Sequence, residues 1–383
     1  MKTARDLSYR YNYRNSYANN KVSTTAKYQT KKTTKKQIPL FHRLVSLGIL
    51  FLLGLFILPY SYNNIAKPLY NSFKSNKTGA TFDSNDLYRK TTFIFHNDSV
   101  NGKRVFINPP KKAVMQTMYE SAEMPHLKSQ LIQLAAQYPT LQPSVFVWDY
   151  QTGKYVDINA DKPYSAASII KIPVLLELFK SIENKELSLK DKFILKDIFR
   201  ASGSGELQFK EENSLYTIDE LARRMMRDSD NSATNILMYL TGGSTNVNRA
   251  MREWGMKTSH ITNWLPDLEG DNKTTAKEMA TMLFNIENPN FLSLSSREYI
   301  IDYLSDIRNN RLIYAGLPSD ALFIHKTGDI GKMLGDAGIV YTSGGERYII
   351  VVLVNRPYNS AAGKDFIVKA SSVIYASMTG GKN

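Results

Sequence analysis

The sequence of 383 residues contains no cysteine. Disulfides, a thiol nucleophile, a lipidated cysteine and a cysteine-bound metal are therefore excluded. Histidine is scarce as well, and its five copies show no metal-ligand spacing. We expect neither a metal nor another cofactor. Stability has to come from a hydrophobic core, which a C-terminal region of about 255 residues is large enough to form.

Acidic residues are almost missing from the N-terminal stretch. Residues 1–43 hold eleven Lys or Arg and one acidic residue, Asp6, so they account for +10 of the net charge of +14. High charge with low hydrophobicity predicts a disordered tail. Tyrosines among the basic residues leave binding to RNA or anionic lipid open for this tail. The rest of the chain carries only about +4, which does not indicate a nucleic-acid partner.

Charged residues are absent between Leu44 and Ala66. Roughly 20 apolar residues cross the hydrocarbon core of a bilayer, so residues 44–62 are predicted to be a transmembrane anchor. A cleaved signal peptide is the alternative, but the basic region is long and no small-x-small cleavage site follows. We expect a single-pass plasma-membrane protein with a cytoplasmic N-terminus and an extracytoplasmic C-terminal part.

Hydrophobic patterns divide the remainder into a polar stalk and a folded domain. Residues 63–120 are polar, apart from one strand-like run at 91–95, and are predicted to be a stalk. Residues 121–383 are predicted to form a monomeric catalytic domain. Strand-like runs occur at 144–150, 155–158, 321–326, 337–342 and 347–355, and helical spacing at 121–137, 168–182, 217–290 and 362–378. The expected fold class is α/β (α+β), a five-stranded antiparallel sheet flanked by helices with an inserted helical lobe.

Three short motifs stand in a fixed order in this domain. They are Ser168-Ile169-Ile170-Lys171, Ser229-Asp230-Asn231 and Lys326-Thr327-Gly328. Ser-x-x-Lys occurs once in the chain, whereas a second Lys-Thr-Gly at residues 77–79 shows that this triplet alone means little. The order and spacing of the three motifs indicate an enzyme that forms an acyl-serine intermediate.

The first two motifs supply a nucleophile and the groups that activate it. Ser168 is predicted to open a helix, and Lys171 lies one turn further on the same face. Lys171 acts as a base only when neutral, and burial and the nearby charge of Lys326 would both lower its pKa. Ser229 is expected to relay a proton and Asn231 to hold a substrate amide. The plain alternatives are a helix N-cap at Ser168 and an Asx turn at residues 229–231.

The third motif is expected to bind the substrate at the end of a strand. Lys326 and Thr327 would hold a carboxylate, and the missing side chain of Gly328 would let a substrate lie along the strand edge. Backbone N–H groups of Ser168 and Asp329 would form an oxyanion hole. An ordinary strand end is the alternative. His325 should point away from the cleft, because neighbouring side chains on a strand alternate.

Residues 126–380 resemble a class A β-lactamase, within the wider family of penicillin-recognising serine enzymes. The resemblance rests on the three motifs, on the Tyr164–Ser168 flank and on the Ser202–Leu207 loop. It implies a β-lactamase/transpeptidase-like fold and an acyl-Ser168 intermediate with a β-lactam or a peptidoglycan-derived peptide.

Two departures from this family concern turnover and binding. Leu265 stands where class A enzymes have the glutamate that activates the deacylating water, and Glu269 stands where they have an asparagine. Asp267 or Glu269 could substitute as the base, with Glu206 as a weaker candidate. The strand after Lys-Thr-Gly lacks the arginine that holds the substrate carboxylate in many members. Lys332 is the nearest cation, so weak β-lactam binding is expected.

The sequence therefore leaves two classes of function open. The first is a membrane-anchored serine hydrolase of β-lactamase type, with a penicillin-binding D,D-peptidase or esterase as its variant. The second is a non-turnover sensor of β-lactams or cell-wall fragments, whose signal would pass through the membrane segment.

Overall fold

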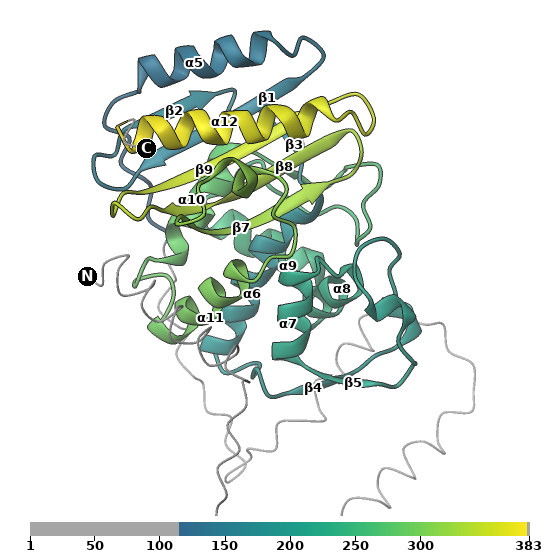
Figure 1. Ribbon diagram of the computed structural model, residues 1–383. Coiled ribbons are helices and arrows are strands. Elements are labelled where there is room, and N and C mark those ends of the chain that lie inside the picture. Colours follow the sequence, from purple (N-terminus) through teal and green to yellow (C-terminus); the bar gives the residue numbers. More distant parts are fainter. Residues whose placement is uncertain (1–114, 381–383) are drawn as a thin grey trace, which may run out of the picture. The chain divides into compact units, whose positions relative to one another are not determined.

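Five antiparallel strands form the centre of the computed structural model, which describes residues 115–380 (Figure 1). Their spatial order is β2-β1-β9-β8-β7. The strands are β1 (Gln142–Asp149), β2 (Tyr155–Ile158), β7 (Leu322–Asp329), β8 (Met333–Tyr341) and β9 (Arg347–Asn355). The predicted five-stranded sheet is thereby confirmed, and the strand that carries Lys326-Thr327-Gly328 lies at its edge.

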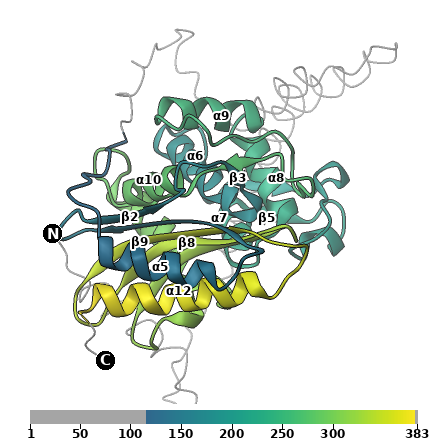
Figure 2. The same cartoon turned by 90° about the horizontal axis from the view of Figure 1, so that it is seen from above.

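Helices cover the sheet on both faces. α5 (Pro125–Ala136) and α12 (Ala362–Met378) lie side by side on one face, and α10 (Ala276–Ile286) packs on the other (Figures 1 and 2). Every residue of β8 is buried as a result. Strands buried on both faces carry nearly continuous apolar runs in place of an alternating pattern.

The expected boundary of β8 is the largest difference among the strands. The prediction began this strand at residue 337, whereas it begins at Met333. Gly335, Asp336 and Gly338 conceal its start, since glycine and aspartate are uncommon in strands. Gly338 is needed for close approach, because a Cβ atom there would lie 2.2 Å from the carbonyl oxygen of Ile324.

A helical lobe is inserted between β2 and β7, as predicted. Its helices are α6 (Lys171–Glu183), α7 (Ile218–Arg227), α8 (Asn231–Leu240), α9 (Gly243–Glu253) and α11 (Leu294–Ser305). Two small sheets were not predicted, namely β4 (Lys192–Ile194) with β5 (Leu215–Thr217), and β3 (Tyr164–Ser165) with β6 (Lys273–Thr274). The 3₁₀ turn η3 (Ala167–Ile170) contacts both β7 and α6 and so links the lobe to the sheet.

The residues before α5 are part of this folded unit. Met118 is buried, and the indole Nε1 of Trp148 donates to the carbonyl oxygen of Tyr119 at 3.0 Å. The sequence prediction placed Met118 and Tyr119 in the stalk. The predicted tail (1–43), the anchor (44–62) and the stalk up to residue 114 lie outside the described residues. Within residues 115–380, no helix is both long enough and apolar enough to cross a membrane.

Candidate active site

Ser168 lies in the 3₁₀ turn η3, immediately before α6 begins at Lys171. The prediction placed it at the first turn of the helix itself. The preceding residue, Ala167, has φ +45°, a left-handed conformation that is uncommon for alanine. This turn leaves Ser168 half-buried while its neighbours Ala167 and Ile169 are buried.

Lys171 joins the first two motifs through its side-chain nitrogen. Its Nζ lies 2.8 Å from Oγ of Ser168. The same nitrogen contacts Ser229 at the carbonyl oxygen (2.8 Å) and at Oγ (2.9 Å), and Oδ1 of Asn231 (3.0 Å). The side chain is completely buried. Burial and then the charge of Lys326 hold the pKa of Lys171 well below its usual value, although Asp230 opposes this. A neutral amine at this place can take the proton of Ser168.

The second motif is held by its own aspartate. Asp230 caps α8 by accepting from the N–H of Ala233, and its other oxygen accepts from the N–H of Leu207, each at 2.9 Å. Ser229 has φ +55°, which turns its carbonyl oxygen and hydroxyl toward Lys171. The 229–231 segment is therefore more than the plain Asx turn, because it also orients groups around the base.

The third motif brings a second buried lysine to the cleft. Lys326 is 1% exposed, and its Nζ donates to the carbonyl oxygen of Thr327 at 3.1 Å. Burial lowers the pKa of Lys326 to about 8, against the raising effect of Asp336. Lys326 is thus an ammonium ion at neutral pH and loses its proton in mildly alkaline solution.

Glycine is required at position 328 for packing as well as for the predicted approach of a substrate. A Cβ atom there would lie 3.0 Å from Cγ1 of Ile169 and 3.1 Å from Cβ of Ala167. The turn η3, which carries Ser168, therefore packs directly on β7 because this residue is glycine. Asp329, next along the strand, accepts from Nη2 of Arg356 at 2.6 Å, so its carboxylate is already bound.

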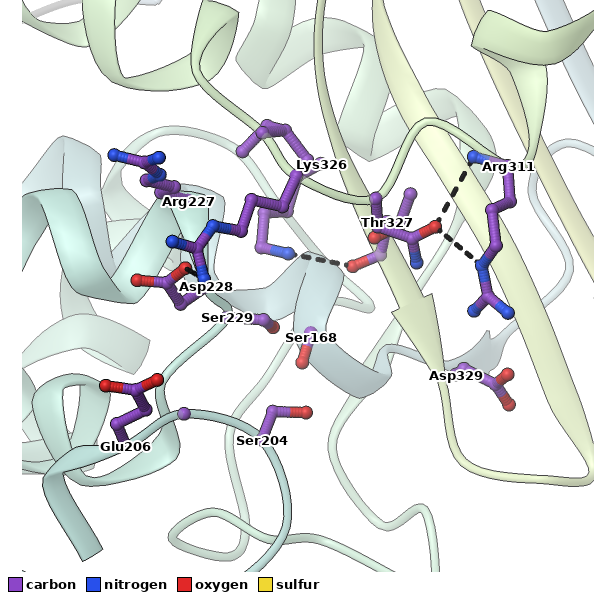
Figure 3. A pocket seen from close by; sticks show the side chains of 14 residues that line it. Ser168, Ser204, Glu206, Arg227, Asp228, Ser229, Arg311, Lys326, Thr327 and Asp329 are labelled. Carbon is purple, nitrogen blue, oxygen red and sulfur yellow. Dashed lines mark hydrogen bonds and ion pairs between the residues drawn. The ribbon is translucent and has the colours of Figure 1, made fainter. Parts of the chain in front are cut away.

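Residues of all three motifs line a cleft of about 380 Å³, namely Ser168, Ser229, Lys326 and Thr327. Figure 3 shows Ser168 between the segment that carries Ser204 and Glu206 and the end of β7 that carries Thr327 and Asp329. The sequence reasoning missed three arginines that also line the cleft, namely Arg227, Arg308 and Arg311. They stand about 60 and 140 residues from Ser168 in the sequence, and only folding brings them to it.

Arg311 differs from the other two arginines. Arg227 and Arg308 pair with Asp306 and Asp228, whereas no carboxylate pairs with Arg311 within residues 115–380. Its Nε contacts Oδ1 of Asn309 at 3.1 Å, which orients the guanidinium (Figure 3). The sequence pointed to Lys332 as the nearest cation. The cleft is lined by Arg311 and not by Lys332.

Leu265 is held beside the second motif by the backbone. Its N–H donates to Oδ1 of Asn235 at 3.0 Å, and its carbonyl oxygen accepts from Nδ2 of that residue at 2.8 Å. Asn235 lies one helical turn after Asn231 on α8. The side chain of Leu265 is buried and has no group that accepts a proton.

The structure brings neither proposed substitute base to the cleft. Asp267 is buried, and its carboxylate accepts from the N–H groups of Asp271 (3.1 Å) and Asn272 (2.8 Å) and from the side chain of Asn263. It stabilises the loop instead. Glu269 is exposed and does not line the cleft. Glu206 does line it, and is 3.7 Å from Lys210.

Known proteins with a similar chain are β-lactamases and a penicillin-binding protein. A sequence profile described as the Beta-lactamase enzyme family matches residues 126–378. Beta-lactamase ROB-1 of Haemophilus influenzae is 30% identical over 229 residues, which are 58% of this chain and 73% of that protein. A β-lactamase of Bacillus licheniformis is 26% identical over 267 residues, 67% of this chain and 85% of its own.

Among solved structures, a leucine-to-glutamate mutant of PBP-A is described as an acyl-enzyme complex with penicillin G. It is 33% identical, has a TM-score of 0.67, and covers 68% of this chain and 98% of its own. PBP-A without this mutation matches with the same identity and TM-score over 69% of this chain and 100% of its own.

Proposed function

Because the chain belongs to the beta-lactamase enzyme family, we propose that it is a serine acyl-enzyme that reacts readily with β-lactams and releases the product slowly. The contact of Lys171 Nζ with Ser168 Oγ at 2.8 Å carries the first half of this proposal. The second half rests on Leu265, which offers no base for deacylation. Two similarities support a penicillin-binding enzyme, namely those to PBP-A and to its acyl-enzyme complex.

Acylation begins with proton transfer. Lys171, neutral because it is buried and lies beside a cation, takes the proton of Ser168 as Oγ attacks the amide carbonyl. Backbone N–H groups of Ser168 and Asp329 receive the developing oxyanion. The C–N bond then breaks, and Ser229 passes its proton to the leaving nitrogen and regains one from Lys171, which is 2.9 Å away.

The substrate carboxylate is held on the far side of the cleft. Lys326, Thr327 and Arg311 supply two cations and a hydroxyl there. A planar guanidinium suits a carboxylate because it donates two parallel hydrogen bonds. This site fits both a penicillin and the C-terminal residue of a cell-wall peptide. Arg311 therefore removes the reason to expect weak β-lactam binding.

Hydrolysis of the acyl ester is the slow step in this proposal. Water needs a positioned base to attack the ester at a useful rate, and such a base contributes about 10²–10⁴-fold. A chromogenic cephalosporin mixed with the full chain should release about one product equivalent per enzyme in a burst, followed by slow turnover. Fast linear turnover without a burst would favour the second candidate, an efficient β-lactamase, which the similarity to ROB-1 suggests.

The cellular setting is also part of the proposal. The charge-free run from Leu44 to Ala66 and the basic stretch before it support a single-pass anchor with the catalytic domain outside the cytoplasm. Protease added to intact cells should then remove the catalytic domain and leave the N-terminal tail protected.

A sensor role would require reversible ligand binding that survives Ser168→Ala.

A further inference from the structure

A buried hydrogen bond joins His325, the residue before Lys326 on β7, to Asp336 on the neighbouring strand β8. His325 and Asp336 are 2% and 0% exposed, and Nδ1 of His325 lies 2.8 Å from Oδ1 of Asp336. His325 points away from the cleft, as its place in the strand predicts. Neither residue lines the cleft, so the acylation steps leave this pair without a role.

Asp336 also binds the segment that carries Arg311. Its second oxygen accepts from the N–H of Ile313 at 3.1 Å. Ile313 opens the turn η6 (Ile313–Gly316), two residues after Arg311. One carboxylate is therefore bonded to the residue before Lys326 and to a residue just after Arg311, and these two cations stand on the same cleft.

The surroundings fix this arrangement. Rings of Phe323 and Tyr314 lie roughly parallel to the imidazole, with centroids at 4.4 and 6.5 Å. Gly338 stands opposite His325 in the β7–β8 register, and a Cβ atom there would lie 2.6 Å from Cβ of His325. From α12, Ser371 donates to the carbonyl oxygen of Ile313 at 2.8 Å.

The charge of Asp336 explains the buried His325–Asp336 pair in a way that a contribution to stability alone does not. Burying charged or polar side chains is costly, and apolar residues of the same shape often serve the fold equally well. The charged and titratable groups around His325 are Asp336, the phenol of Tyr314 and, across the strand, Lys326. Asp336 favours the protonated form of Lys326, and Lys326 in turn lowers the pKa of Lys171.

We propose that Asp336, oriented by His325, is a positioning residue for acylation: it fixes the end of β7 that carries Lys326 against the segment that carries Arg311. The carboxylate of Asp336 also favours the protonated form of Lys326. This inference rests on the proposed function only for its effect on rate. Its effect on Lys326 exists without any substrate. The two parts can therefore be tested separately.

The first test needs no substrate. In the full chain labelled with ¹³C at the lysine ε-carbon, the Lys326 signal is assigned by its loss in Lys326→Arg and titrated with pH. Asp336→Asn should move the Lys326 midpoint to lower pH. The matched control is Glu278→Gln, because Glu278 also accepts several hydrogen bonds, from Lys257, Thr258 and Ser259, away from Lys326. An unchanged midpoint in Asp336→Asn would overturn the proposal.

The second test separates orientation from folding. Asp336→Asn should slow acylation by benzylpenicillin about ten- to a hundredfold, with most of the loss in the rate at saturation. His325→Phe, which keeps the stacking but not the hydrogen bond, should act similarly, and His325→Gln, which keeps a donor, should recover part of the rate. If all three variants are acylated as fast as wild type, and only their melting temperature falls, as in Glu278→Gln, the His325–Asp336 pair is purely structural. A wild type that no penicillin acylates would refute the proposed function, while the lysine titration would still decide the inference.

Discussion

At the scale of single residues, two buried lysines with lowered pKa values divide the chemistry. Lys171 is placed to be neutral and to accept a proton, while Lys326 is placed to be charged near neutrality. The state of Lys171 depends on that of Lys326, because the charge of Lys326 lowers the pKa of Lys171. The sequence could predict these roles from the motifs, but the burial that tunes them is a property of the fold.

The state of Lys326 predicts the alkaline side of the pH profile. Its pKa of about 8 means that it is charged below this pH and neutral above it. Acylation should therefore fall as pH rises through 8, because the cleft loses a cation and Lys171 regains a higher pKa. Arginine stays charged over the whole range, so Lys326→Arg should remove the alkaline limb. The measurement is the acylation rate against pH, and an identical limb in the variant would contradict the assignment.

Leu265 predicts the lifetime of the acyl-enzyme. Leu265→Glu places a carboxylate beside Asn235 and the second motif, and should shorten the lifetime of the penicillin adduct by at least about tenfold. Leu265→Gln has nearly the same shape without the base and is the matched control. Lifetimes that are equal in these two variants would show that the missing carboxylate is not what limits deacylation.

At the scale of elements, one side of the cleft is formed by contacts between the end of α7 and the segment that joins α11 to β7. Arg308 lies 2.9 Å from Asp228, Arg227 lies 3.6 Å from Asp306, and the N–H of Arg308 donates to the carbonyl oxygen of Arg227. Asp228 immediately precedes Ser229. These pairs therefore support the segment that carries Ser229, which lines the cleft.

The Arg308–Asp228 pair predicts a change in activity with little change in stability. Partly exposed ion pairs contribute about 0–1 kcal/mol. Arg308→Ala should therefore lower the free energy of unfolding by no more than about 1 kcal/mol. Acylation should fall several-fold because Ser229 loses a support. Arg249→Ala, which removes a pair with Glu253 on α9, serves as the control. Equal acylation in both variants would argue against a role for the pair, with urea unfolding as the stability measurement.

The sequence predicts where the helices and strands lie better than it predicts the side-chain contacts between them. Alternating and apolar runs locate all five strands of the central sheet, because burial on a sheet leaves a local pattern. The contacts of Arg308 with Asp228 and of Asp336 with Ile313 leave no such pattern, since these partners lie 80 and 23 residues apart in the sequence. Asp267 illustrates the limit: its position suggested a base, yet three N–H donors of its own loop already bind its carboxylate.

At the scale of the whole molecule, the folded unit includes residues before α5. Met118 is 8% exposed, and the N–H of Ser121 donates to the carbonyl oxygen of Gly153 at 2.9 Å. Burying a methionine contributes about 1.5–3 kcal/mol. A chain that begins at residue 115 should therefore unfold at a higher urea concentration than one that begins at 121. Identical midpoints would mean that this segment adds nothing to the fold.

The central claim is that Ser168 is acylated quickly and released slowly, and one measurement tests it most directly. Intact-protein mass spectrometry follows the full chain mixed with benzylpenicillin over time, with Ser168→Ala as the control. The account predicts an adduct of one penicillin that forms on wild type, persists after free antibiotic is removed, and is absent from the variant. Consumption of the antibiotic with no lasting adduct would contradict it, and so would an adduct that survives Ser168→Ala.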